Sequence, residues 1–160
     1  MSATVTHKAY LGLGTNLGNR ADNLDTAIRA LQQHAGRLLE CSSYFTTEPW
    51  GFSSDNGFLN AAVLIETTLT PHELLTQTQQ IERQMGRTHK SINAQYADRI
   101  IDIDILFYDD QIISTRTLQI PHPLIGQRDF VLRPLAEIAP DHVHPQSGKT
   151  IAALLAALQS

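Results

Sequence analysis

Residues 99–107, RIIDIDILF, are the segment that most constrains the fold, because a run of high β-propensity is interrupted by two acidic residues. Side chains alternate faces along a strand, so Asp102 and Asp104 point to one face, with Cα atoms about 6.6 Å apart. The isoleucines at the alternate positions, with Arg99 and Phe107, take the opposite face and can fill a core. Two like charges on a mostly buried strand repel each other unless something neutralises them. The two aspartates are therefore either ligands for a divalent cation such as Mg²⁺ or gatekeeper residues, whose charge prevents an edge strand from pairing with another chain.

The whole chain sets limits on the class of protein. Its 160 residues suffice for a hydrophobic core, and we expect a single domain over residues 1–160. A formal charge of −4 argues against a general nucleic-acid binder, and no apolar run approaches the ~20 residues of a membrane span. The one cysteine, Cys41, allows no disulfide within the chain, which fits a cytoplasmic protein, and we expect it to be a small core residue.

Hydrophobic periodicity predicts two strand–helix–strand units followed by smaller elements. We expect strands at residues 9–13, 38–46, 58–66 and 99–107. One helix begins at Asp22 or Asn23 and ends at Gly36, and a second begins with Thr70 as N-cap and ends at Gly86. After a turn at residues 109–110 we expect a hairpin through 111–114, a short helix over 133–138 and a final amphipathic helix over 151–158. The fold class is α+β: a ferredoxin-like βαβ-βαβ sandwich with helices on one face, an added hairpin and C-terminal helices.

Three loops carry residues of chemical interest. Residues 12–18 are rich in glycine but match neither the dinucleotide fingerprint nor the Walker A loop, so we expect a tight turn, with close approach of the backbone to a ligand as the alternative. Residues 47–57 contain Trp50, which either covers a core edge or stacks on a flat ring. Residues 87–98 are long for a connection and carry Arg87, His89 and Lys90, which suit either an anionic ligand or a solvated loop.

The residues with no obvious structural role form two sets. The first suits a polyphosphate with metal ions and comprises Arg87, His89, Lys90, Arg99, Asp102, Asp104, His122 and Arg128. The second suits a flat, hydrogen-bonding heterocycle and comprises Trp50, Phe58, Asn60 and Phe130. Together the two sets indicate phosphoryl-type transfer from a nucleotide to a small aromatic acceptor.

The sequence also resembles a known family over about residues 9–145. The motifs that carry the resemblance are LGLGTNLG at 11–18, FLNAA at 58–62, Ile81-Glu82 with Gly86-Arg87, DRIIDIDI at 98–105, IPHP at 120–123 and residues 128–135. In this order they resemble hydroxymethyl-dihydropterin pyrophosphokinase of the folate pathway. The resemblance implies Mg²⁺-dependent transfer of pyrophosphate from ATP to the hydroxymethyl group of 6-hydroxymethyl-7,8-dihydropterin, with release of AMP.

By resemblance, each site residue receives a role. Asp102 and Asp104 would bind two Mg²⁺ ions. The nucleotide set would be Gln79, Glu82, Arg87, His89, Arg99, Ile105, His122 and Arg128. The pterin set would be Thr47, Glu48, Trp50, Phe58, Asn60, Asp102 and Phe130. Catalysis would rest on Arg87, Arg99, Asp102, Asp104, His122 and Arg128. The glycine-rich loop at 12–18 and loops 47–57 and 87–98 would close over the substrates and exclude water.

Some positions depart from the family pattern and keep other hypotheses open. His89 stands where a second loop arginine is common, Tyr96 where a tryptophan is familiar, and Glu48 and Pro123 replace a proline and a tyrosine. One alternative is a non-catalytic protein that binds pterin or nucleotide. Another is a metal-dependent phosphodiesterase, which the acidic charge disfavours. We expect a monomer that binds neither nucleic acid nor membrane.

Overall fold

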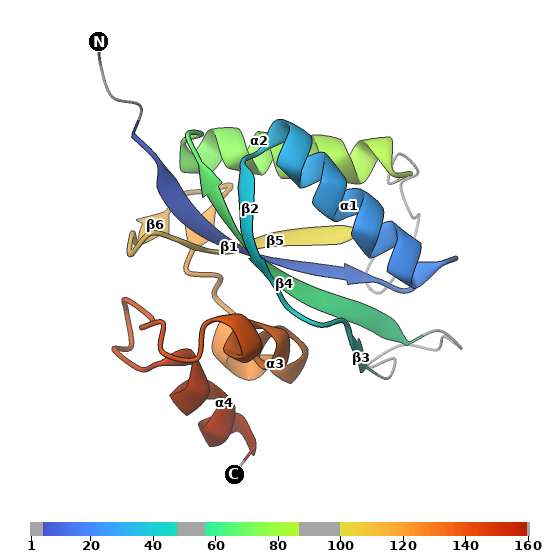
Figure 1. Cartoon of the computed structure of the whole chain (residues 1–160). Helices are drawn as coiled ribbons and strands as arrows, with labels where there is room; N and C mark the ends of the chain where they lie inside the picture. Colours follow the sequence, from blue (N-terminus) through green and yellow to red (C-terminus); the bar gives the residue numbers. More distant parts are fainter. Residues whose placement is uncertain (1–4, 48–56, 87–99, 160) are drawn as a thin grey trace.

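A sheet of antiparallel strands forms the centre of the structure, a computed structural model that describes residues 5–47, 57–86 and 100–159. The main strands are β1 (His7–Thr15), β2 (Arg37–Cys41), β4 (Phe58–Thr67) and β5 (Asp102–Tyr108). Their order across the sheet is β2-β4-β1-β5, and the short β3 (Phe45–Thr47) pairs with the start of β4 (Figure 1). The predicted strand around the two aspartates therefore exists, and it lies at one edge of this sheet.

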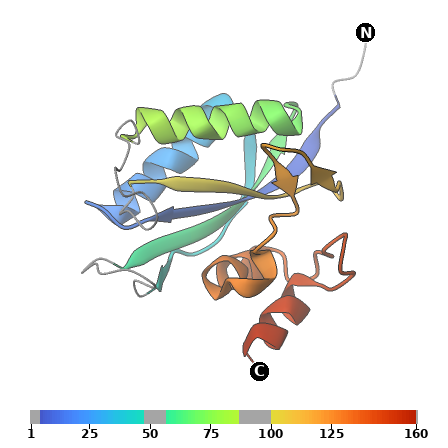
Figure 2. The same ribbon diagram turned by 180° about the vertical axis from the view of Figure 1, so that it is seen from behind.

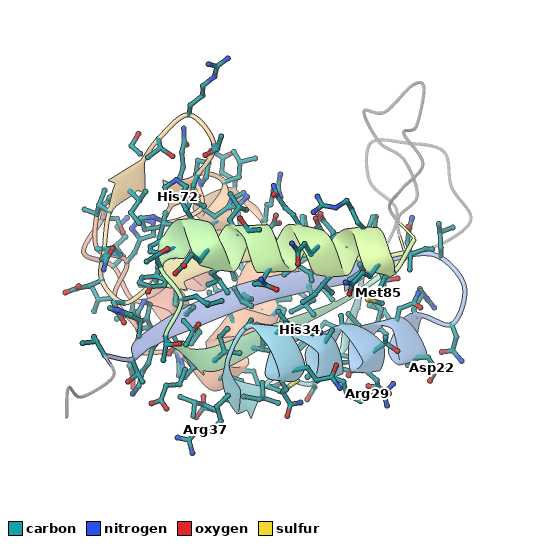
Figure 3. The ribbon with its side chains drawn as sticks, turned by 90° about the horizontal axis from the view of Figure 1, so that it is seen from above. Asp22, Arg29, His34, Arg37, His72 and Met85 are labelled. Carbon is teal, nitrogen blue, oxygen red and sulfur yellow. The ribbon has the colours of Figure 1, made fainter. Side chains whose placement is uncertain are left out.

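The first two helices cover one face of the sheet, as predicted. α1 (Arg20–His34) and α2 (Pro71–Gln84) lie side by side (Figure 3), and their apolar stripes bury Leu24, Ile28 and Leu31 on α1 and Leu74 and Ile81 on α2. The predicted capping box of α2 is present, with Thr70 and Glu73 exchanging side-chain and backbone hydrogen bonds. α1 begins earlier than predicted, because the side chain of Asn19, rather than Asp22 or Asn23, accepts from the Asp22 N–H.

The opposite face is covered by the C-terminal elements, which the prediction of helices on one face did not anticipate. A 3₁₀ turn, η2 (Ile125–Gln127), leads into α3 (Asp129–Ile138), and α4 (Ile151–Gln159) follows (Figure 2). α3 begins before the expected residue 133 and includes Pro134. Of the stripe predicted for α4, Ile151 is buried, but Leu158 remains 38% exposed. A second core cluster, including Leu132, Leu135 and Ile151, lies beneath these helices.

A bulge in β5 divides its side chains between the two cores in a way that simple alternation does not predict. Tyr10 on β1 pairs with Phe107, whereas the next residue, Leu11, pairs with Ile105, so Leu106 is an extra residue. Ile103 and Ile105 therefore pack under α1 and α2, as expected, but Phe107 joins Leu106 in the cluster beneath α3 and α4. The prediction that Phe107 shares a face with the isoleucines is wrong because the bulge reverses the alternation.

Other differences are local. The predicted strand over 38–46 is interrupted between β2 and β3, where the buried Ser42 Oγ accepts from the Ala62 N–H at 2.9 Å. Cys41 is consequently exposed and is not the core residue that we expected. The hairpin forms between β6 (Ile113–Ser114) and β7 (Gln119–Ile120) instead of pairing with β5. Among the described helices, none is long and apolar enough to cross a membrane.

Candidate active site

Two rows of residues across the sheet form the floor of the candidate site. In the first row Asn60 of β4, Gly14 of β1 and Asp102 of β5 are direct partners. In the second row Ala62, Gly12 and Asp104 are partners. Side chains that are opposite each other in an antiparallel ladder project from the same face, so both aspartates and Asn60 share the face that α3 and α4 cover further along. Both predicted features of the aspartates, a common face and a place in an edge strand, are therefore present.

The glycines of β1, the middle strand of both rows, let neighbouring side chains lie directly over this strand. A Cβ added to Gly14 would lie 3.0 Å from Asn60 Oδ1 and 3.6 Å from Phe58 Cδ1. The space above Gly14 is therefore flanked by an amide and an aromatic ring. The strand expected over 9–13 continues to Thr15, so Gly14 lies inside β1 with Gly12 instead of in a tight turn. The alternate spacing of the two glycines was the feature that could have revealed this, because a glycine inside a strand often marks close approach.

The aspartates are half-buried, and their strand is also held from α2. Glu82 on α2 is buried, and its Oε2 accepts a hydrogen bond of 2.8 Å from the backbone N–H of Ile103, the residue between the two aspartates. Asp102 and Asp104 offer hard carboxylate oxygens, the donors that Mg²⁺ prefers. This donor chemistry fits a hard cation. In the described part of the chain, no group of three or more His, Cys, Asp or Glu side chains could hold a metal ion, so the protein ligands here would be these two carboxylates.

His122 is brought to Asp102 by a segment that crosses back over β5. The His122 N–H donates to the Leu106 carbonyl at 3.1 Å, and the Leu124 N–H donates to His122 Nδ1 at 3.2 Å. Burial lowers the pKa of His122, the positive charge of Arg128 lowers it further, and Asp102 acts in the opposite direction. An imidazole that accepts at Nδ1 carries its proton on Nε2, so this neutral side chain can donate to an anion.

Arg128 and Phe130 lie at the start of α3. The Arg128 guanidinium carbon is 5.6 Å from the centre of the Phe130 ring, within range of a cation–π interaction. Both side chains are half-buried. A member of the predicted phosphate set and a member of the predicted heterocycle set are therefore in direct contact.

The other predicted site residues lie on β4, on α2, in the core of the sheet or outside the described residues. Phe58 is half-buried at the start of β4, where its partner in β3 is Thr47. Gln79 is exposed on α2, and Ile105 is 5% exposed in the core beneath α1 and α2, on the face opposite the aspartates. The remaining ones lie outside the described residues: Glu48, Trp50, Arg87, His89, Lys90 and Arg99. The same holds for loops 47–57 and 87–98, apart from their ends.

Sequence reasoning missed the polar contacts that fix the first loop beside the floor. Asn23 Nδ2 donates to Thr15 Oγ1 at 3.1 Å and to the Leu17 carbonyl at 2.7 Å. The Arg20 guanidinium donates to the Gly57 carbonyl at 2.6 Å, which joins the start of α1 to the residue before β4. These partners are distant in sequence or depend on the loop geometry, so no local pattern marks them.

The comparisons with known proteins agree with one another. Residues 10–140 match the family model described as 7,8-dihydro-6-hydroxymethylpterin-pyrophosphokinase. The chain is 48% identical over 139 residues to the 2-amino-4-hydroxy-6-hydroxymethyldihydropteridine pyrophosphokinase of Porphyromonas gingivalis, covering 86% of this chain and 94% of that one. It is 44% identical over 131 residues to the enzyme of the same name from Bacillus subtilis, covering 81% and 77%.

A solved structure supports the fold independently. The crystal structure of Plasmodium falciparum HPPK-DHPS with pteroate matches with a TM-score of 0.79 at 19% sequence identity. The match covers 98% of this chain but 43% of the longer Plasmodium chain. At this identity the likeness bears on the architecture of the sheet and its helices.

Proposed function

This chain belongs to the 7,8-dihydro-6-hydroxymethylpterin-pyrophosphokinase family and is an ATP-dependent pyrophosphokinase of folate biosynthesis, and from this premise we propose how its residues hold the two substrates. The reaction transfers the pyrophosphoryl group of ATP to the hydroxymethyl oxygen of 6-hydroxymethyl-7,8-dihydropterin and releases AMP. The observation that carries the proposed arrangement is the row Asn60–Gly14–Asp102, which sets an amide and a carboxylate on either side of a glycine.

We propose that the pterin occupies the Asn60 end of the row. The Asn60 side chain offers both a donor and an acceptor, as the edge of a pterin requires. Phe58 flanks the space above Gly14, and Phe130 supplies a second ring at the start of α3. By family resemblance Thr47, Glu48 and Trp50 complete this pocket, and Asp102 lies between it and the phosphates.

The triphosphate would lie at the other end, against His122 and Arg128. The closeness of His122 to both Arg128 and Asp102 supports this assignment, since the pKa of His122 responds to both neighbours. A fixed guanidinium and a neutral imidazole that donates from Nε2 can offset the negative charge that develops on transferred phosphoryl oxygens. By resemblance, Gln79, Arg87, His89, Arg99 and Ile105 are the other nucleotide contacts.

Asp102 and Asp104 would hold two Mg²⁺ ions. Their shared face and their carboxylate chemistry support this assignment. When bound, Mg²⁺ supplies charge that orients phosphate oxygens and favours transfer. Asp102 and Asp104 would thereby hold the phosphate oxygens between the pterin, at the Asn60 end of the floor, and His122, at the other end.

We also propose the fold class, the cellular compartment and the oligomeric state. The strand order β2-β4-β1-β5 with all neighbours antiparallel supports the ferredoxin-like class. One cysteine and no disulfide support a reducing cytoplasm. We propose a single-domain monomer over residues 1–160, for which size-exclusion chromatography with light scattering is the measurement.

The deciding experiment is release of AMP. Purified protein with ATP, Mg²⁺ and the reduced pterin should form AMP and pyrophosphorylated pterin in equal amounts, separable by anion-exchange chromatography. Omitting the pterin, or chelating Mg²⁺ with EDTA, should abolish both products. Mg²⁺-dependent nucleotide binding without AMP would instead favour the non-catalytic alternative, and formation of ADP would contradict pyrophosphoryl transfer.

A further inference from the structure

The hydrogen bond between Glu82 and Ile103 joins α2 to the strand that carries both aspartates. β5 ends the strand order of the sheet, so one of its edges faces β1 and the other faces away from it. Asp102 and Asp104 pair with Gly14 and Gly12 on the β1 side. Backbone groups alternate direction along a strand, and the Ile103 N–H points the other way, to Glu82 Oε2 at 2.8 Å.

The position of this carboxylate is fixed by the helix that carries it. α2 starts at a complete capping box, and its residues Leu74 and Ile81 are at most 1% exposed in the core. Glu82 itself is 8% exposed. A buried backbone N–H requires an acceptor, and a carboxylate is a stronger acceptor than a neutral oxygen. The peptide between the two aspartates is therefore held from both sides, by β1 and by a rigid helix.

We propose that Glu82 is a positioning residue for the Asp102–Asp104 pair. By accepting the Ile103 N–H it fixes the backbone from which both carboxylates project, and so sets the separation at which they bind a divalent cation. The inference rests on the proposed role of the aspartates in binding Mg²⁺. It gives Glu82 a role different from the nucleotide contact implied by family resemblance, because Glu82 acts here through Ile103.

Two conservative substitutions at Glu82 separate the effect of side-chain length from the effect of charge. Glu82→Gln removes the charge but keeps an oxygen at the same distance along the side chain, so it can still accept from Ile103. Glu82→Asp keeps the charge but withdraws the oxygens by one methylene, about 1.5 Å on a 2.8 Å hydrogen bond, which is too far to keep it. A positioning role predicts that Glu82→Asp is the damaging change. If Glu82 instead acts through its charge on the metal or the nucleotide, Glu82→Gln should be the damaging change.

The first measurement requires neither substrate nor metal. Amide hydrogen exchange followed by NMR on the ligand-free protein reports directly on the Ile103 N–H. We expect protection of this amide to fall about tenfold in Glu82→Asp and to change less than about threefold in Glu82→Gln. The amides of Leu11 and Leu13 in β1 serve as internal references.

The second measurement is the Mg²⁺ dependence of AMP release at saturating substrates. In Glu82→Asp the Mg²⁺ concentration for half-maximal activity should rise about tenfold while the KM for the pterin changes little. In Glu82→Gln this Mg²⁺ concentration should change less than about threefold. The same two substitutions at Glu66, whose carboxylate pairs with Arg37 at 3.4 Å near the far end of the sheet, are the matched controls. A merely structural role would lower thermal stability without changing the Mg²⁺ dependence.

Each outcome is decisive. Unchanged Ile103 protection in Glu82→Asp would overturn the proposal, and so would a larger Mg²⁺ effect in Glu82→Gln than in Glu82→Asp. If the wild-type protein released no AMP, the proposed function would fail, whereas the exchange measurement would still test the positioning of β5 by Glu82. A raised KM for ATP in both variants, with unchanged Mg²⁺ dependence, would assign Glu82 to the nucleotide and overturn the positioning role.

Discussion

Replacing Gly14 with alanine tests whether the position of the Asn60 amide beside this residue matters for binding the pterin. The new Cβ would lie 3.0 Å from Asn60 Oδ1, whereas an unstrained carbon–oxygen contact is about 3.3–3.6 Å. The amide oxygen must therefore retreat by roughly 0.3–0.6 Å. It would then lose part of one hydrogen bond to the pterin, which contributes about 0.5–1.5 kcal/mol. The KM for the pterin should consequently rise about 2- to 13-fold.

The fold should tolerate this change. Gly14 lies in an extended strand, where alanine gains roughly 0.5–1 kcal/mol over glycine through chain entropy, and this gain offsets strain at Asn60. We expect the melting temperature to stay within about 3 °C of wild type. Steady-state kinetics with each substrate varied in turn, together with thermal unfolding, measure both effects. The KM for ATP should not change.

Gly12→Ala is the matched control. Its Cβ would meet the flexible Leu106 side chain at 3.4 Å, an ordinary contact in the apolar part of the same face. This variant should bind the pterin nearly as wild type does. Equal pterin KM values for the Gly14 and Gly12 variants would refute the reasoning, because steric pressure on Asn60 is the feature that distinguishes them.

Three further predictions follow. Asp102→Ala and Asp104→Ala should each reduce turnover by orders of magnitude while preserving the melting temperature, because removing one like charge relieves repulsion; near-normal turnover in both would contradict the metal assignment. Burial lowers the pKa of His142, so the unfolded chain binds this proton more readily, and stability should fall as pH drops below ~6.5. His142→Phe should shrink the difference in melting temperature between pH 7.5 and pH 5, and an unchanged difference would oppose this cause. Thr70→Ala should cost about 1 kcal/mol in urea unfolding without altering either KM, since it removes only the α2 cap.

Local patterns sufficed for the parts of the fold that depend on local physics. The capping box at Thr70 and the apolar stripes of α1 and α2 are set by residues within one or two turns of each other. The common face of Asp102 and Asp104 likewise follows from strand alternation alone. These features could be predicted because each involves only neighbouring positions.

Contacts between distant segments could not be predicted in the same way. The bulge at Leu106 depends on the pairing of β5 with β1, and it moved Phe107 to the other core. The approach of His122 to Asp102 depends on a backbone hydrogen bond to Leu106, for which the sequence contains no marker. The sequence likewise contained no marker for the pairing that places Gly12 and Gly14 between β4 and the two aspartates.

The contact between Arg128 and Phe130 has a thermodynamic consequence. With the proposed roles, the guanidinium that meets the phosphates rests on the ring that meets the acceptor, 5.6 Å from its centre. A shift of either side chain on binding then changes the energy of the other, so the two substrates become linked. Linkage of binding free energies is reciprocal: the factor by which nucleotide tightens the pterin must equal the factor by which pterin tightens the nucleotide. Titrating each substrate in the presence of the other would measure this single coupling energy twice.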